Sequence, residues 1–302
     1  MAQVREVLDR IGSVRNTQKI TKAMKMVSAA KLNRAQARME GIRRYAGNIA
    51  RAMCGLYPNL YGDEHPLLKA RPQVKRALYI VITGDRGLCG GFNNNIFRFL
   101  AARDLTNKGE TDAKFFVIGK RGIANIGKRY GKENLLHTWT DVFDKLSFTL
   151  TGDIASNLLQ CYLSPKPENR IDAVYMVYNR FASRIKQEVV VDSLMPLSLK
   201  SVQADAVSGG QQPYDKRLVY AIEPDPATAM NSLVEHYLAV DIFHAVIESY
   251  AAELAARVNA MENATNSAGD MIDSLTLLYN RARQAGITNE LLDIIGGANA
   301  LG

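Results

Sequence analysis

The sequence predicts an α/β protein that carries a long antiparallel coiled coil. The two ends of the chain would pair as a shaft, and the middle would fold around a sheet. Three observations support this prediction. A heptad repeat runs through each end of the 302-residue chain, the two ends carry opposite charge, and strand-like and helix-like segments alternate between them. Helices of the length that these repeats indicate exceed what an ordinary globular core needs.

The first 56 residues keep one heptad frame, with a seam residue at alternating steps of three and four. The seam consists of Val4, Val7, Ile11, Val14, Gln18, Thr21, Lys25, Ser28, Leu32, Ala35, Met39, Ile42, Ala46, Ile49, Met53 and Leu56. With a rise of about 1.5 Å per residue, such a helix is on the order of 80 Å long. We expect it to end near Tyr57 and Pro58, where a loop rich in Pro and Gly begins.

The C-terminal end holds a second unbroken frame. Its seam consists of Met230, Leu233, Tyr237, Val240, His244, Ile247, Ala251, Leu254, Val258, Met261, Thr265, Ala268, Ile272, Leu275, Tyr279 and Ala282. The segment Glu223 to Pro226 should start this helix, because proline is accepted in the first turn of a helix but not inside it. The helix would be on the order of 100 Å long.

The two ends carry opposite charge. Residues 1–56 hold twelve Lys and Arg against three carboxylates, whereas residues 227–302 hold three Arg against nine carboxylates. Opposite charges that flank a seam select the partner and the orientation of a coiled coil. The sequence therefore predicts that residues 1–56 lie next to residues 227–285.

Between the ends, short apolar β-branched runs alternate with helical patterns, which is typical of a Rossmann-like, mostly parallel sheet with helices. The predicted strands are Ala77 to Thr83, Lys114 to Ile118 and Ile171 to Tyr178, and the predicted helices are Asn93 to Asn107, Arg121 to Tyr130 and Ile154 to Leu163. Residues 181–199 read as a further extended segment, and Lys200 to Pro213 as an exposed loop.

These elements divide the chain into four parts. We expect an N-terminal coiled-coil helix at 1–57, a linker at 58–76, an α/β domain at 77–222 and a C-terminal coiled-coil helix at 223–302. A hydrophobic content of 47% allows one sizeable core. The three cysteines show no CxxC spacing and no even count, which favours reduced thiols that fill space.

Several classes of protein are disfavoured. No apolar run approaches the roughly 18 to 20 residues of a membrane span, and the first residues do not read as a signal peptide. We therefore expect no direct insertion into a membrane. The four histidines form no metal-binding pair, and no Ser, His and Asp set stands out, so the sequence predicts no catalytic residues, no metal and no cofactor.

The segment Gly84 to Asn93, GDRGLCGGFN, lies between a buried strand and a helix, where a phosphate-binding loop would sit. Its spacing matches neither GxGxxG nor GxxxxGK[ST], and Lys120 stands where an acidic residue would close the next strand. We expect a tight turn that glycine permits, rather than a nucleotide site, with Asp85 and Arg86 as candidate surface contacts.

The basic N-terminal helix leaves an alternative function open, because a helical hairpin with Lys and Arg on one face can bind nucleic acid. Tyr45 is the sole aromatic residue in 1–56, so a base-stacking surface is missing from this segment. We favour a solvated face opposite an acidic partner helix and keep the nucleic-acid-binding hairpin as the alternative.

Two features call for partners beyond the coiled coil. Ile20, Met24 and Val27 form an apolar stripe rotated away from the seam, which itself turns polar over the same stretch. The C-terminal helix is also the longer one, so its end would be left unpaired and apolar. That end contains Ile287, Leu291, Leu292, Ile294 and Ile295.

Three motifs carry a resemblance that covers essentially the whole chain. They are NTQKITKAMKMVSAAK at Asn16 to Lys31, TGDRGLCGGFN at Thr83 to Asn93, and YNRARQAGITNELLDIIGGANAL at Tyr279 to Leu301. In these motifs and their order the chain closely resembles the gamma subunit of bacterial F-type ATP synthases.

The resemblance implies a rotor without chemistry of its own. Its shaft would sit in an alpha3beta3 hexamer, and its α/β domain would stand on the membrane ring of c subunits beside the epsilon subunit. The whole would lie on the cytoplasmic side of a bacterial plasma membrane. By the same resemblance, six residues match positions that touch the catalytic beta subunits: Met24, Lys25, Arg257, Gln284, Thr288 and Glu290.

Overall fold

The structure is a computed structural model, and it describes most of the chain. The described residues are 2–56, 67, 71–103, 105, 111–166, 169–197, 202, 222, 223 and 225–300. The side chains of residues 2, 3, 290, 293 and 296–300 are outside this description. Most of the predicted linker at 58–76 and nearly all of the predicted loop from Lys200 to Pro213 lie outside the described residues.

The chain divides into two compact units, which we call the shaft unit and the α/β unit. The shaft unit consists of Met1–Ala30 and Arg257–Gly302, and the α/β unit of Lys31–Ala256. Two long helices, α1 (Ala2–Leu56) and α7 (Pro226–Ala300), contribute to both units. Asp225 caps α7, since its carboxylate accepts hydrogen bonds from the amides of Ala227 and Thr228 at 3.0 and 2.9 Å.

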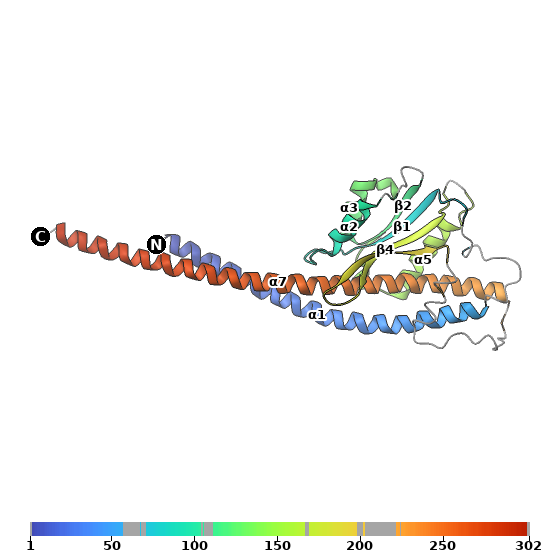
Figure 1. The fold of residues 1–302 in the computed structure, drawn as a ribbon, viewed down its shortest axis with the longest axis horizontal. Coiled ribbons are helices and arrows are strands. Elements are labelled where there is room, and N and C mark those ends of the chain that lie inside the picture. The colour runs from blue at the N-terminus through green and yellow to red at the C-terminus, as the bar shows by residue number, and fades with distance from the viewer. Residues whose placement is uncertain are drawn as a thin grey trace. The chain divides into compact units, whose positions relative to one another are not determined.

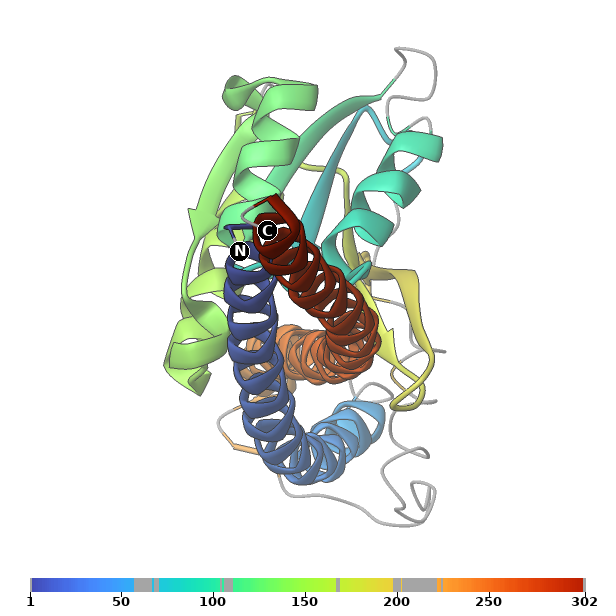
Figure 2. The same ribbon diagram turned by 90° about the vertical axis from the view of Figure 1, so that its left-hand side faces the viewer.

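Both predicted seams are confirmed by burial. Every residue of the two seams is buried or half-buried, although large parts of both helices are exposed. In the shaft unit, the first part of α1 lies beside α7, and the C-terminal end of α7 extends past the start of α1 (Figures 1 and 2). Gln18 pairs with Thr265 and Lys25 with Glu262, so the residue number rises on one helix as it falls on the other. The two helices are therefore antiparallel.

The α/β unit contains a five-stranded sheet in the order β3-β2-β1-β4-β5. The strands are β1 (Arg76–Ile82), β2 (Asp112–Ile118), β3 (Leu135–Trp139), β4 (Ala173–Phe181) and β5 (Gln187–Met195). The first four pair in parallel and β5 pairs antiparallel with β4. The predicted class of a mostly parallel sheet with helices is confirmed.

Helices cover both faces of this sheet (Figure 1). On one face, α2 (Phe92–Ala102) and α3 (Lys120–Tyr130) pack against a core that includes Val81, Phe115 and Val117. On the other face, α5 (Phe148–Tyr162) and the first part of α7 share a larger core with the sheet. Residues 234–255 of α7 are mostly buried all round, as expected of a helix enclosed by a sheet and other helices.

Some elements differ from the sequence prediction. Helix α2 ends at Ala102 rather than Asn107, because Arg103 takes an extended conformation. Helix α5 begins at Phe148 rather than Ile154, where the Ser147 hydroxyl accepts a hydrogen bond from the Leu150 amide. Strand β3 and the short helices α4 (Val142–Lys145) and η3 (Lys132–Asn134) were not predicted. Within the described residues, the helices include no stretch that is both long and apolar enough to span a membrane.

Candidate functional site

The predicted contact residues do not gather in one pocket. All six belong to the shaft unit, with Met24 and Lys25 on α1 and the other four on α7. About 22 residues separate Glu262, the partner of Lys25, from Gln284, which corresponds to roughly 33 Å along a helix. The candidate site is therefore an extended surface of two patches along the shaft.

The first patch centres on Lys25. Its ammonium lies 2.6 Å from Glu262 Oε1, and both side chains are more than a third exposed. Met24 beside it is half-buried, and Arg257 is half-buried on α7. An exposed ion pair contributes under about 1 kcal/mol, so this pair aligns the two helices more than it stabilises them.

A polar layer lies one turn further along the seam. The hydroxyl oxygens of Thr21 and Thr265 are 2.8 Å apart, and Gln18 Nε2 donates to the Thr265 carbonyl at 3.4 Å. Each hydroxyl also has a backbone acceptor on its own helix, the Gln18 carbonyl at 3.0 Å for Thr21 and the Met261 carbonyl at 2.7 Å for Thr265, so either can be the donor between the two hydroxyls. This layer replaces apolar packing with directional contacts between the helices.

The second patch is the exposed surface near the end of α7. Gln284 and Thr288 lie one turn apart on the same face, and the Thr288 hydroxyl donates to the Gln284 carbonyl at 3.0 Å. Both side chains are exposed. The side chain of Glu290 lies outside the described residues.

Apolar side chains are exposed around both patches. Ile20 and Val27 are 60% and 58% exposed, and Met24 of the same predicted stripe is half-buried. All five residues of the predicted apolar tip are exposed, from 48% at Ile287 to 69% at Ile294. A shaft with so much uncovered apolar surface is typical of a protein that works inside a larger assembly.

In the α/β unit, the segment 84–91 forms the tight turn that the sequence predicted. Leu88 and Gly90 have φ of 61° and 57°, in the left-handed region. The expectation for Asp85 needs correction: its two carboxylate oxygens accept hydrogen bonds from the amides of Lys120 and Asp141, both at 3.0 Å. Asp85 thus ties three loops together, whereas Arg86 is exposed and lies 3.6 Å from Asp144.

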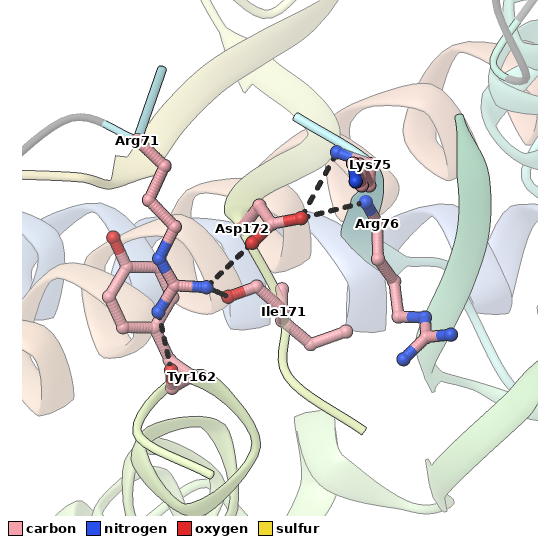
Figure 3. A network of polar contacts seen from close by, with 6 residues as sticks. All are labelled: Arg71, Lys75, Arg76, Tyr162, Ile171 and Asp172. Atoms are coloured by element: carbon pink, nitrogen blue, oxygen red, sulfur yellow. Dashed lines mark hydrogen bonds and ion pairs between the residues drawn. The ribbon is translucent and has the colours of Figure 1, made fainter. Parts of the chain in front are cut away.

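At the opposite end of the sheet, where the parallel strands begin, a partly buried ion pair anchors the segment before β1 (Figure 3). Arg71 Nη1 lies 2.7 Å from Asp172 Oδ1, and Arg71 Nη2 donates to the Tyr162 carbonyl at 2.8 Å. Asp172 Oδ2 accepts from the amides of Lys75 and Arg76, both at 3.0 Å. Burial opposes ionisation of Asp172, but Arg71 and the two amides outweigh it and hold the pKa of this carboxyl below its usual value.

The described residues offer little for chemistry. Among them, no three His, Cys, Asp or Glu side chains lie close enough to hold a metal ion. Cys54, Cys89 and Cys161 form no disulfide, and burial raises the pKa of Cys54 and Cys161, which disfavours the reactive thiolate.

Sequence reasoning missed some of these partners. Glu262 contacts Lys25, and Thr265 contacts Thr21, only when the two helices pair in the observed register. The polar residues in the N-terminal seam were a visible sequence signal of such contacts. The Arg71–Asp172 pair had no sequence signal, because about 100 residues separate its members.

The chain is similar to known proteins over its whole length. A family model described as ATP synthase matches residues 3–301. ATP synthase gamma chains from Chloroherpeton thalassium and from a Geobacter species are each 38% identical, over 100% of this chain and 99% of theirs.

Solved structures agree. The central stalk and c-ring of the Tetrahymena thermophila mitochondrial ATP synthase includes a chain with 25% identity and a TM-score of 0.58, which matches 81% of this chain and 99% of that one. A chain of the Euglena gracilis mitochondrial ATP synthase shares the fold, with a TM-score of 0.66, 21% identity, and 99% and 95% of the two chains covered. These matches give the alternative of a nucleic-acid-binding hairpin no support, and the chain belongs to the ATP synthase family, among its gamma chains.

Proposed function

We propose that this chain is the central-stalk rotor of an F-type ATP synthase. It couples ion flow through a membrane ring to conformational cycling of the catalytic beta subunits, and so to ATP synthesis or hydrolysis. The observation that carries the proposal is its similarity to gamma chains over its full length. The exposed apolar surface of the shaft unit supports it.

The partners follow from this role. The shaft contacts the alpha and beta subunits of an alpha3beta3 hexamer, and the α/β domain contacts the epsilon subunit and the c-ring. The chain itself is not an enzyme and needs no cofactor, because catalysis belongs to the beta subunits. It works as a peripheral protein on the cytoplasmic side of a bacterial plasma membrane. Its N-terminal helix, linker and α/β domain end at residues 57, 76 and 222, and the C-terminal helix follows.

The mechanism requires the shaft to make different contacts with each of the three beta subunits. Three chemically identical beta subunits adopt different conformations only if something interacts with them differently. The shaft unit offers different side chains in different directions, with Ile20 and Val27 on one helix and Gln284 and Thr288 on the other. Each orientation of the shaft therefore favours a different conformation in each beta subunit, and rotation passes the three through the same cycle.

A paired substitution at the second patch tests this role. The variant Gln284→Ala/Thr288→Ala should assemble and fold like the parent, because both side chains are exposed. We expect a changed ratio of ion pumping to ATP hydrolysis in the reconstituted complex. The matched control is Thr276→Ala, whose exposed hydroxyl also bonds within its own helix, to the Ile272 carbonyl at 2.7 Å.

Two results would count against the assignment of these contacts. One is unchanged hydrolysis and pumping in the paired variant, together with further substitutions at Met24 and Arg257. The other is an equal effect of the Thr276 control, which would point to a general change in the helix.

A further inference from the structure

Basic side chains gather at the edge of the sheet where the parallel strands begin. The segments that lead into β1, β2 and β4 meet at this edge, because parallel strands start at the same side of a sheet. The described basic residues there are Arg71, Lys75, Arg76, Arg103, Lys114, Lys166 and Arg170, and the described acidic ones in the same segments are Asp112 and Asp172. Among the described residues of these segments, positive charge exceeds negative charge.

A hollow of about 560 Å³ opens among these residues. Its lining includes four cationic side chains, Arg71, Lys75, Arg76 and Arg170, together with Gln73 and a single carboxylate, Asp172. Figure 3 shows Arg71, Lys75 and Arg76 arranged around Asp172. The hollow therefore presents an excess of positive charge.

The carboxylate in the lining is already neutralised. Asp172 is 8% exposed, and its oxygens accept from Arg71 and from two backbone amides. Arg71 is equally engaged, with hydrogen bonds to Asp172 and to the carbonyls of Ile171 and Tyr162. Arg71 and Asp172 therefore form one fixed side of the hollow, and their opposite charges cancel.

Other cations in the lining have donors to spare. The Nε of Arg76 forms an ion pair with Asp112 Oδ2 at 2.9 Å. Within the described residues, the Lys75 ammonium and the Arg170 guanidinium make no hydrogen bond or ion pair, although the backbone amide of Lys75 is held by Asp172. Two cations thus face a preformed hollow, and the backbone of one of them is fixed by a buried residue.

We propose that this hollow binds a phosphate group. Guanidinium and ammonium donors that converge from two segments, 71–76 and 170–172, match the several oxygens of a phosphate ester better than the two of a carboxylate. A lipid headgroup and a free phosphate ester share this chemistry, and the hollow has room for the glycerol of either. The hollow belongs to the α/β unit, whereas the candidate contact residues belong to the shaft unit.

Vesicle binding by the full chain tests the lipid source. The hollow variant Lys75→Gln/Arg170→Gln is compared with Arg5→Gln/Arg15→Gln, which removes the same charge from exposed positions of α1. On vesicles of equal parts phosphatidylglycerol and phosphatidylcholine, the hollow variant should bind roughly 30-fold more weakly than the parent, at about a factor of five per basic residue. The α1 variant should change by less than about threefold.

A charge-preserving exchange, Lys75→Arg/Arg170→Lys, should retain most of the binding. Equal losses in the hollow and α1 variants would overturn the proposal, since they would mean diffuse attraction to the basic chain. An unchanged affinity of the hollow variant would overturn the lipid source. Urea midpoints should be the same in all variants, because the substituted side chains are exposed.

Phosphate in solution tests the second source. Glycerol 3-phosphate and inorganic phosphate are titrated into the parent chain while the Arg170 Nε–H resonance is followed by NMR. A saturating shift that the Lys75→Gln exchange weakens supports the site even where vesicles do not bind. Absence of both the shift and the vesicle effect would refute a phosphate site.

Discussion

Thr21 and Thr265 meet inside the seam of the coiled coil, with their hydroxyl oxygens 2.8 Å apart. Thr21 is 9% exposed, and Ser28 further along the same seam is 4% exposed. A polar contact at a seam position favours one register over others, because a slip breaks the contact between the two hydroxyls and the bond from Gln18 to the Thr265 carbonyl. This layer therefore defines how α1 and α7 align in the shaft unit.

The double substitution Thr21→Val/Thr265→Val should loosen that alignment. Stability should change by less than about 1 kcal/mol, because both hydroxyls are replaced together by groups of the same shape. Register can be read from engineered disulfides. Lys25→Cys/Glu262→Cys reports the observed register, and Lys25→Cys/Gly269→Cys reports a slip of one heptad.

We expect the parent to form the first disulfide alone and the double valine chain to form both. Thr276→Val, on the exposed face of α7, is the control and should behave like the parent. If the slipped disulfide stays absent in the double valine chain, apolar packing alone sets the register.

Replacing Asp172 by Asn should destabilise the α/β unit at neutral pH. The Arg71 guanidinium would keep its carbonyl partners but lose a buried counter-charge, at a cost of about 2 kcal/mol. Because the pKa of Asp172 is lowered in the folded chain, its contribution is present above the unfolded value of about 3.9 and is lost as pH falls through the folded pKa.

Urea unfolding of parent and Asp172→Asn chains at several pH values checks this. The gap between their midpoints should be constant from pH 7 to 5 and should narrow toward pH 3. Asp153→Asn, at an exposed position of α5, should show little gap at any pH. A gap that widens in acid would contradict the assigned ion pair.

The contribution of Glu248 to stability should change with pH in the opposite direction to that of Asp172. Burial raises the pKa of Glu248, and the opposing effects of Arg180 and Tyr178 do not cancel this. Folding therefore favours the protonated acid, so this residue stabilises the fold below the unfolded pKa of about 4.3, and the contribution is lost as pH rises through the folded pKa. Glu248→Gln should raise the unfolding midpoint at pH 7.5 and leave it nearly unchanged at pH 4. A lower midpoint at pH 7.5 would show that the carboxylate is needed in its charged form.

His244 makes the chain sensitive to acid. Burial, together with the charges of Arg43 and Arg180, lowers the pKa of His244 to about 4. The unfolded chain binds a proton near pH 6.5, so the contribution of neutral His244 is present above that pH and is lost progressively toward pH 4, by up to about 3 kcal/mol. His244→Gln should lose less stability than the parent between pH 7 and 4. His236→Gln, on an exposed position of α7, should follow the parent.

The shaft could be predicted from the sequence almost residue by residue. Heptad spacing is a local signal, and it placed Val7 and Met261 in the seam, where they are 7% and 4% exposed. Two helix boundaries were also predictable. Pro58 interrupts the helical pattern after α1, and Pro226 starts α7. Local spacing and helix breakers carry this information without knowledge of the fold.

Other features depend on tertiary structure. Strand β3 is an edge strand of five residues whose middle positions are exposed, so it lacks the apolar pattern of a strand. The role of Asp85 depends on which loops meet at the end of the sheet. The Lys25–Glu262 pair joins residues 237 positions apart and exists in only one register. Such contacts follow from the assembled fold and have no local signature.

As a rotor, this chain would turn inside its partners. The most direct measurement attaches a bead to Ile185→Cys, a position that is 87% exposed in the α/β unit, with the alpha3beta3 hexamer fixed to a surface. Adding ATP should make the bead rotate in one direction, and removing ATP should stop it. Steady ATP hydrolysis by the same complexes with a stationary bead would contradict the rotor.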